Sequence, residues 1–300
     1  MENIEIAKVC GLCAGCKFAI KSAEDCLKTN NNVTLFKEVV HNKSVNNSLK
    51  EKGINVKNNL SDLCKDEVVI LRAHGEPPET YNYLSQNEIS FVDCTCINVK
   101  KIHSLVQDYS NNGYRIIIIG KYGSKSGKMH PEIFGTIGWC NGKGILIEDD
   151  SDLAKLEDLK NEKLYVVCQT TFNIEKADSL IEKIKQIATN SGCEIVINKS
   201  ICGAQRAINK ASVSLAKQVD LMIVIGSEMS SNSAELAKNV STVAKTIFFE
   251  DITKIKDELI KNNITLTKDI KIGLTAGAST DTHELLWLKD VLQNMIDNLD

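Results

Sequence analysis

The sequence has little that would separate its parts or tie it to a membrane. Only 3 prolines occur in 300 residues, and no linker rich in Gly, Ser or Pro divides the chain, so we expect closely packed domains. No apolar run is long enough to cross a bilayer, and the first residues lack the pattern of a signal peptide. A net charge of -3 gives no general attraction to nucleic acid or to anionic lipid. We therefore expect a cytoplasmic protein that binds neither.

Two signatures of nucleotide binding are also missing. No G-x-G-x-x-G follows a first strand and no Walker A sequence occurs, which disfavours NAD and ATP as ligands. Cysteine, in contrast, is abundant. The chain has 11, an odd number that disulfides explain poorly in a cytosolic protein of this size. The cysteines that lie at predicted strand ends or tight turns are Cys10, Cys13, Cys16, Cys94, Cys96 and Cys202.

Short apolar runs alternate with amphipathic segments along the chain. The predicted strands are Glu67–Leu71, Arg115–Ile119, Lys163–Val167, Leu221–Ile225 and Lys271–Leu274. The predicted helices are Lys17–Leu27, Val99–Tyr109, Ile174–Ala188, Gln205–Lys217, Ala234–Val240 and His283–Ile296. Such alternation is typical of an α/β protein with parallel sheets and right-handed crossovers.

Small, hydroxyl or imidazole residues follow each predicted strand. These strand ends lead to His74, His130, Thr170, Ser230 and Ser279. Open parallel sheets bind ligands beyond the carboxyl ends of their strands. If these ends converge, they form a pocket rich in OH, NH and imidazole donors, which suits a phosphate or diphosphate.

The pattern of cysteines favours a metal cluster over disulfide bonds. Cys10, Cys13 and Cys16 have the C-x2-C-x2-C spacing that begins a ferredoxin run, but the fourth cysteine of that run does not follow. The second C-x2-C of a typical zinc site is also missing. Three separate places with thiols and no obvious fourth ligand suit an iron–sulfur cubane with one open iron, which can act as a Lewis acid. For any single cysteine, an inert buried thiol is the alternative.

Several short motifs occur in a fixed order over nearly the whole chain. They are Cys13-Ala14-Gly15, Glu38-Val39-Val40-His41-Asn42, Ala73-His74-Gly75, Asp93 with Thr95-Cys96, His130-Pro131-Glu132, Gln169-Thr170-Thr171, Cys202, Ser230-Ser231-Asn232-Ser233 and Thr275-Ala276-Gly277-Ala278-Ser279. This pattern resembles the 4-hydroxy-3-methylbut-2-enyl diphosphate reductase family. The resemblance implies a trefoil of three α/β domains with small parallel sheets around a central, cluster-containing cavity. The corresponding domains would span residues 1–97, 98–198 and 199–300.

The resemblance also implies roles for individual residues. Cys13, Cys96 and Cys202 would each hold one iron of a 4Fe–4S cluster, and Glu132 with Thr170 would deliver protons. The residues implied to bind the diphosphate are His41, His74, His130, Ser230, Ser231, Asn232 and Ser279. The implied reaction is the reductive dehydroxylation of 4-hydroxy-3-methylbut-2-enyl diphosphate to isopentenyl and dimethylallyl diphosphate, with electrons from ferredoxin or flavodoxin.

The sequence departs from the family pattern around the proposed cluster. Cys10, Cys16 and Cys94 stand where the family usually has other residues, and they are candidate further ligands of a variant cluster or a redox-active pair. Two alternatives follow: a paralogous iron–sulfur reductase with a different small substrate, or an electron-transfer or cluster-carrying protein without catalysis. Glu132 and Thr170 argue against the carrier, because a carrier needs no proton donor.

Overall fold

The structure, a computed structural model, describes residues 3–39, 43–123, 129–227, 230–278 and 280–299. Within these residues there are three four-stranded sheets, and every strand pairing in them is parallel. The predicted α/β class with small parallel sheets is therefore confirmed. The chain divides into two compact units, which we call the terminal unit (Met1–Lys17, Val40–Lys52 and Gly203–Asp300) and the central unit (Phe18–Val39 and Gly53–Cys202).

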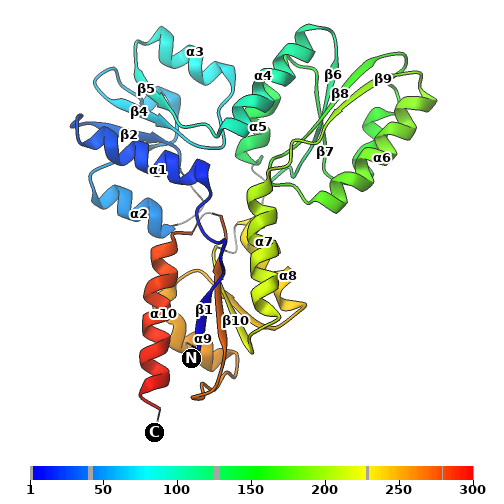
Figure 1. Ribbon diagram of the computed structural model, residues 1–300. Coiled ribbons are helices and arrows are strands. Elements are labelled where there is room, and N and C mark those ends of the chain that lie inside the picture. The colour runs from blue at the N-terminus through cyan, green and yellow to red at the C-terminus, as the bar shows by residue number, and fades with distance from the viewer. Residues whose placement is uncertain (1–2, 40–42, 124–128, 228–229, 279, 300) are drawn as a thin grey trace. The chain divides into compact units, whose positions relative to one another are not determined.

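The terminal unit has one sheet covered by helices on both faces (Figure 1). In sheet order its strands are β1 (Ile4–Ile6), β12 (Ile272–Ala276), β10 (Leu221–Ile225) and β11 (Lys245–Phe249). Its helices are α2 (Lys43–Glu51), α7 (Gly203–Ala216), α8 (Ser231–Ser241), α9 (Ile255–Lys261) and α10 (Thr282–Asp297), with a short 3-10 helix η3 (Ile252–Lys254). Along β10, Ile223 packs with α9 and α10 while Met222 and Val224 pack with α7 and α8. A strand buried on both faces explains its continuous apolar sequence.

The N-terminal strand belongs to this same sheet. Ile4 pairs with Ile272 and Ile6 with Leu274, so residues from opposite ends of the sequence lie side by side. This differs from the expectation that the first residues join a continuous domain 1–97. The physical reason is that β1 has only three residues, and their local pattern does not specify a partner strand far along the chain.

The central unit contains the other two sheets. The strands of the first are β3 (Asn55–Lys57), β2 (Val33–Phe36), β4 (Val68–Leu71) and β5 (Ser90–Asp93), in sheet order. Those of the second are β7 (Gly144–Ile147), β6 (Arg115–Ile119), β8 (Lys163–Cys168) and β9 (Glu194–Asn198). The helices are α3 (Pro78–Gln86), α4 (Ile97–Asn111), α5 (Pro131–Gly138), α6 (Ile174–Asn190), η1 (Leu60–Asp62) and η2 (Asp150–Leu156), and α1 (Ala14–Leu27) enters from the terminal unit.

The second sheet shows how the sequence builds the core. Ile116 and Ile118 pack with α4 and α5 on one face, whereas Ile117 and Ile119 pack with α6 on the other. All four side chains are at most 1% exposed, and burying each contributes about 1.5–3 kcal/mol. The run RIIII therefore forms a central strand held by core packing on both faces. The position of its carboxyl end is fixed, and so is the start of the segment that follows it.

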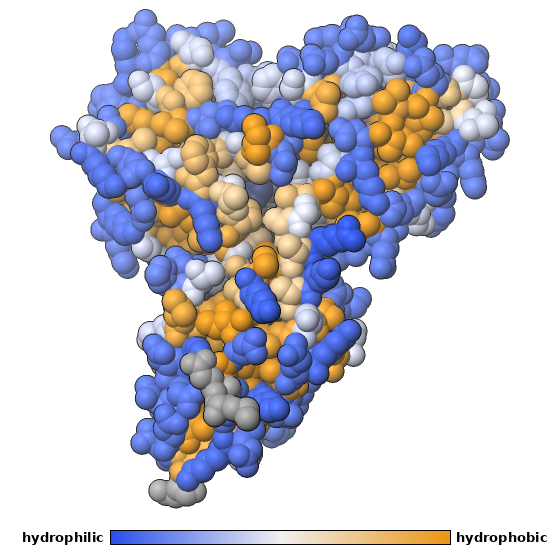
Figure 2. Space-filling model, viewed as in Figure 1, coloured by the Kyte–Doolittle hydropathy of each residue, from blue (hydrophilic) through white to orange (hydrophobic). Residues whose placement is uncertain are grey.

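The eleven elements predicted from the sequence all occur, with ends within three residues of the expected positions. No helix within the described ranges combines the length and apolar character that a membrane span requires. Figure 2 shows hydrophilic residues interspersed with apolar ones on the visible face of both units.

Candidate active site

The turn after β4 presents His74. The main-chain N–H of Gly75 donates to the carbonyl of Arg72 at 3.2 Å, which closes a tight turn. Gly75 has a φ of +79°, and a Cβ atom there would lie 2.5 Å from Cε1 of His103. Only glycine fits this position without strain, because it tolerates positive φ and has no side chain. The ring of His74 lies edge-on to that of His130, with their centroids 5.9 Å apart.

His130 begins α5 and fixes the next functional residue. It is the N-cap of the helix, with Pro131 in the first turn, and its Nδ1 accepts a hydrogen bond from the main-chain N–H of Glu132 at 3.2 Å. Proline at the start of a helix is favourable because its missing N–H is not needed there. The His-Pro-Glu motif is thus a helix start that turns the Glu132 side chain inward.

Glu132 and Thr170 form a buried pair. The carboxyl group of Glu132 accepts one hydrogen bond from the main-chain N–H of Thr170 at 2.6 Å and another from its hydroxyl at 2.7 Å. Glu132 is 3% exposed, and burial raises its pKa to about 7, although the bonds from Thr170 partly oppose this rise. A carboxyl group with a pKa near neutrality can hold and release a proton at working pH.

Thr170 also connects this pair to a cysteine. Its carbonyl accepts a hydrogen bond from the main-chain N–H of Cys202 at 2.7 Å. The Sγ atom of Cys202 in turn accepts a bond from the side-chain amide of Asn98, in the first turn of α4, at 3.4 Å. Cys96 caps that helix and donates its main-chain N–H to the carbonyl of Ala73 at 3.0 Å, next to His74.

These contacts form a closed ring within the central unit. It runs from the His74 turn through Cys96 and α4 to Cys202, then through Thr170 and Glu132 to His130, and back to His74. The structure therefore connects Cys96, Cys202, the two imidazoles and the Glu132 carboxyl through one set of contacts, and the roles that the sequence assigns to them stay predictions. Five of the predicted site residues meet here with Cys202: His74, Cys96, His130, Glu132 and Thr170.

The terminal unit positions Cys13 by a different route. The loop before α1 is bonded to the loop after β12, because Gly11 N–H donates to Ala276 at 3.0 Å and Leu12 N–H to Thr280 at 2.8 Å. Gly11 has a φ of +72°, and a Cβ atom there would lie 2.7 Å from Thr282. The thiols of Cys13 and Cys16 lie 3.5 Å apart, and their hydrogen bond lowers the pKa of Cys13 to about 6.

The same unit holds the predicted serine motif. Ser230 caps α8, accepting from the main-chain N–H of Ser233 at 3.4 Å, and Asn232 lies in the first turn of that helix. Ser233 is fully buried, and a Cβ atom on Gly277 would lie 2.1 Å from its hydroxyl oxygen. A capped helix start is a favourable place for an anion. His41 and Ser279 lie outside the described residues, and the Ser231 side chain is likewise not described.

The three additional cysteines lie in different surroundings. Cys16 is next to Cys13, as described. Cys10 packs against the apolar clusters on both faces of the terminal sheet. Cys94 is fully buried and hydrogen bonds with Ser22 of α1. An open cavity of about 430 Å³ lies beside Cys10 and Cys13, and Lys8 and Lys17 also line it.

The cysteines predicted as iron ligands share one feature. Cys13, Cys96 and Cys202 each directly precede a helix, namely α1, α4 and α7. A helix N-terminus stabilises a thiolate and a negatively charged cluster. Within the described ranges, no three His, Cys, Asp or Glu side chains meet at a point that could hold a single metal ion. Cluster ligands need not meet in this way, because each thiolate binds its own iron. The chemistry of these three thiols, each at a helix start, therefore fits that of cluster ligands.

Sequence reasoning missed several residues around this ring. Lys37, Arg72 and Glu76 form a partly buried ion network around the turn that carries His74, and Asn98 bonds to Cys202. His103 stacks on Trp139, and burial lowers its pKa to about 4. The sequence does indicate an ion pair between Arg72 and Glu76, because their opposite charges lie four residues apart and flank Ala73-His74-Gly75.

The fold and site define an α/β protein whose strand ends and helix starts carry thiols, imidazoles and hydroxyls. The chain belongs to the LytB family, since the model of the family described as "LytB protein" matches residues 4–295. It is 36% identical to a 4-hydroxy-3-methylbut-2-enyl diphosphate reductase of Clostridioides difficile (strain 630), over 99% of this chain and 100% of that protein. A reductase of the same name from Caldanaerobacter subterraneus is 35% identical, over 93% and 92%.

Solved structures agree with this assignment. A structure of (E)-4-hydroxy-3-methyl-but-2-enyl diphosphate reductase, described as the terminal enzyme of the non-mevalonate pathway, matches with a TM-score of 0.73 and 30% identity, over 98% of this chain and 100% of that chain. The reductase structure from Plasmodium falciparum matches with a TM-score of 0.80 and 26% identity, over 99% and 88%.

Proposed function

We propose that the chain is the reductase that removes the allylic hydroxyl of 4-hydroxy-3-methylbut-2-enyl diphosphate. The observation that carries the proposal is the ring of contacts that joins Cys202, Thr170 and Glu132 to His130 and His74. The names of the relatives and their full-length match support it. A cluster carrier would not need the buried, proton-holding carboxyl of Glu132.

The proposed reaction consumes two electrons and two protons. The C–O bond of the allylic alcohol breaks, the oxygen leaves as water, and the allylic fragment takes up one proton to give isopentenyl or dimethylallyl diphosphate. Cys13, Cys96 and Cys202 would hold a 4Fe–4S cluster. When bound, it supplies the electrons and a Lewis-acidic iron.

The chain's own residues would supply the rest of the chemistry. Glu132 holds a proton near neutral pH, and the hydroxyl of Thr170, 2.7 Å from its carboxyl oxygen, would relay it to the leaving oxygen. His74 and His130 would bind the diphosphate through charge-assisted hydrogen bonds. Ser230 and Asn232 at the start of α8 would provide further donors.

Glu132→Gln tests this assignment. It keeps the shape of the side chain and removes the transferable proton, so we expect anaerobic turnover with a reduced dye to fall at least about 100-fold. Iron and sulfide content should stay at the wild-type level. Glu79→Gln, which changes a carboxylate in the first turn of α3, is the matched control and should keep full activity. Wild-type turnover by Glu132→Gln would exclude Glu132 as the proton donor.

The additional thiols support a second candidate, a related reductase with a variant cluster. The specific observation is the 3.5 Å contact between the thiols of Cys13 and Cys16. A larger ligand set of this variant cluster would include Cys10 and Cys94 as well. Mössbauer spectroscopy of the anaerobic protein distinguishes the cases: an ordinary cubane spectrum that is unchanged when Cys10, Cys16 and Cys94 become alanine rules out their ligation.

An external protein must deliver the electrons in either case. We propose ferredoxin or flavodoxin as the donor, in the cytoplasm. The chain has 11 cysteines, an odd number that disulfides explain poorly, which supports a reducing compartment. Turnover sustained by reduced ferredoxin or flavodoxin in place of the dye tests the choice of donor.

A further inference from the structure

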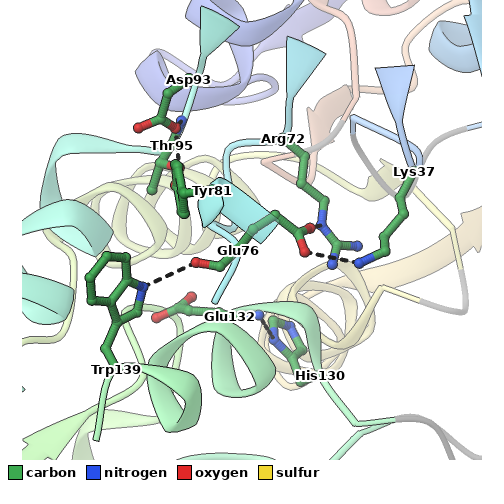
Figure 3. A network of polar contacts seen from close by, with 9 residues as sticks. All are labelled: Lys37, Arg72, Glu76, Tyr81, Asp93, Thr95, His130, Glu132 and Trp139. Carbon is green, nitrogen blue, oxygen red and sulfur yellow. Dashed lines mark hydrogen bonds and ion pairs between the residues drawn. The ribbon is translucent and has the colours of Figure 1, made fainter. Parts of the chain in front are cut away.

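An ion network lies just beyond the carboxyl end of β4. Arg72 and Glu76 flank the turn that carries His74, and Nε of Arg72 lies 2.7 Å from Oε1 of Glu76. Lys37, which follows β2, places its Nζ 2.9 Å from the other oxygen, Oε2. Figure 3 shows both cationic side chains pointing to the same carboxylate. Each oxygen of Glu76 therefore holds a different cation.

The network has more positive than negative charge. Among the described residues, Glu76 is the one carboxylate in the network, and its side chain, 0% exposed, faces two cations. The side chain of Arg72 is 10% exposed and that of Lys37 is 26% exposed. Arginine keeps its charge in proteins. Burial lowers the pKa of Lys37, and the ion pair with Glu76 partly opposes that shift. Burying a surplus charge is costly unless an opposite charge is nearby. The arrangement is therefore suited to an anion that is not part of the chain.

The backbone at Lys37 supports a specific role for this side chain. Lys37 has a φ of +66°, in the left-handed region that residues other than glycine rarely adopt. The conformation is held by a hydrogen bond from its main-chain N–H to the carbonyl of Lys57, at 2.8 Å. Strain of this kind persists where the surrounding structure requires it, and it is common at ligand sites.

The network is connected to the two imidazoles through neighbouring residues. Arg72 and His74 belong to one turn, closed by the bond from Gly75 to Arg72. The Nζ of Lys37 lies 5.5 Å from the ring centre of Phe134, which is one helical turn after His130 in α5. The indole of Trp139 donates to the carbonyl of Glu76 at 3.0 Å, which fixes the network against the end of α5 (Figure 3).

We propose that Lys37 and Arg72, held in place by Glu76, are charge-selectivity residues that favour a diphosphate over a monophosphate. This inference rests on the proposed function and deepens it. A second phosphoryl group adds negative charge to the ligand, and the surplus cation beside His74 and His130 stabilises that added charge through space.

The first sheet contains a matched control for this idea. Lys57 pairs with the buried Glu67 at 2.8 Å, and Glu67 also accepts from the hydroxyl of Thr34 at 2.6 Å. Glu67 lies just before β4, at the opposite end of the strand from Arg72. This pair has one cation for one carboxylate, so it carries no surplus charge. Its loss should affect stability and not the choice of ligand.

The test compares isopentenyl diphosphate with isopentenyl monophosphate by calorimetry on the anaerobic, cluster-loaded chain. For Lys37→Met we expect about tenfold weaker binding of the diphosphate and about threefold weaker binding of the monophosphate. Lys37→Arg keeps the charge and should restore most of the diphosphate affinity. Lys57→Met should lower the melting temperature without changing either dissociation constant.

Three results would overturn the inference. Lys37→Met could weaken both ligands equally, it could weaken neither, or Lys57→Met could reproduce its effect; each would show that the network only supports the fold. A wild-type chain that converts the allylic diphosphate while Lys37→Met binds both ligands normally would reject this inference alone. A wild-type chain that binds neither ligand and shows no turnover would reject the proposed function with it.

Discussion

Replacing Asn98 with leucine should lower the reduction potential of a bound cluster. The side-chain amide of Asn98 donates to Sγ of Cys202 at 3.4 Å, and such a bond stabilises the more negative, reduced state of a cluster whose ligand is that sulfur. Hydrogen bonds to charged groups contribute about 1.5–3 kcal/mol. Asn98 is exposed and the bond is long, so we take about 0.5–1 kcal/mol as the difference between the two redox states.

This energy converts directly to a potential. A tenfold change in a one-electron equilibrium is 59 mV, or about 1.4 kcal/mol, so the expected decrease is about 20–40 mV. The assay is an anaerobic redox titration with mediator dyes, followed by electron paramagnetic resonance. Asn112→Leu is the control, because Asn112 caps the other end of α4 and bonds to the carbonyl of Asp108. An unchanged or raised potential in Asn98→Leu, with normal iron content, would refute the reasoning.

Two further predictions concern the turn at His74 and the buried carboxyl. Gly75→Ala should lower the free energy of unfolding in urea by about 2–5 kcal/mol, because the positive φ and the close contact with His103 both disfavour a side chain. Adding His103→Ala should restore part of this loss. Equal stability of the wild type and Gly75→Ala would contradict the prediction. Because the pKa of Glu132 is about 7 when folded and about 4.5 when unfolded, the unfolded state binds fewer protons in between. Stability should therefore fall as pH rises from about 4.5 to 7, by up to about 3 kcal/mol, and Glu132→Gln should lack this part of the pH dependence.

Local patterns were enough to predict the strand ends of this fold. The run RIIII became β6 with unchanged ends, because a strand buried on both faces leaves a continuous apolar sequence. The motif at His130 was predicted as part of the site, and it starts α5 as proline at a helix start favours. The turn or helix that directly follows a strand could thus be predicted without a structure.

Contacts between distant parts of the chain could not be predicted in this way. Lys37 meets Glu76 across 39 positions, and Asn98 meets Cys202 across 104. Neither residue lies in a motif, and lysine and asparagine side chains are usually solvated. The surroundings of Cys94 were hidden for the same reason, because its partner Ser22 lies on a helix far earlier in the chain.

Turnover is the most direct test of the account. The anaerobically reconstituted chain is incubated with 4-hydroxy-3-methylbut-2-enyl diphosphate and a reduced dye, and the products are identified by nuclear magnetic resonance. We predict isopentenyl and dimethylallyl diphosphate, with two electrons consumed for each molecule formed. Unchanged substrate in the presence of a fully loaded cluster would contradict the assignment.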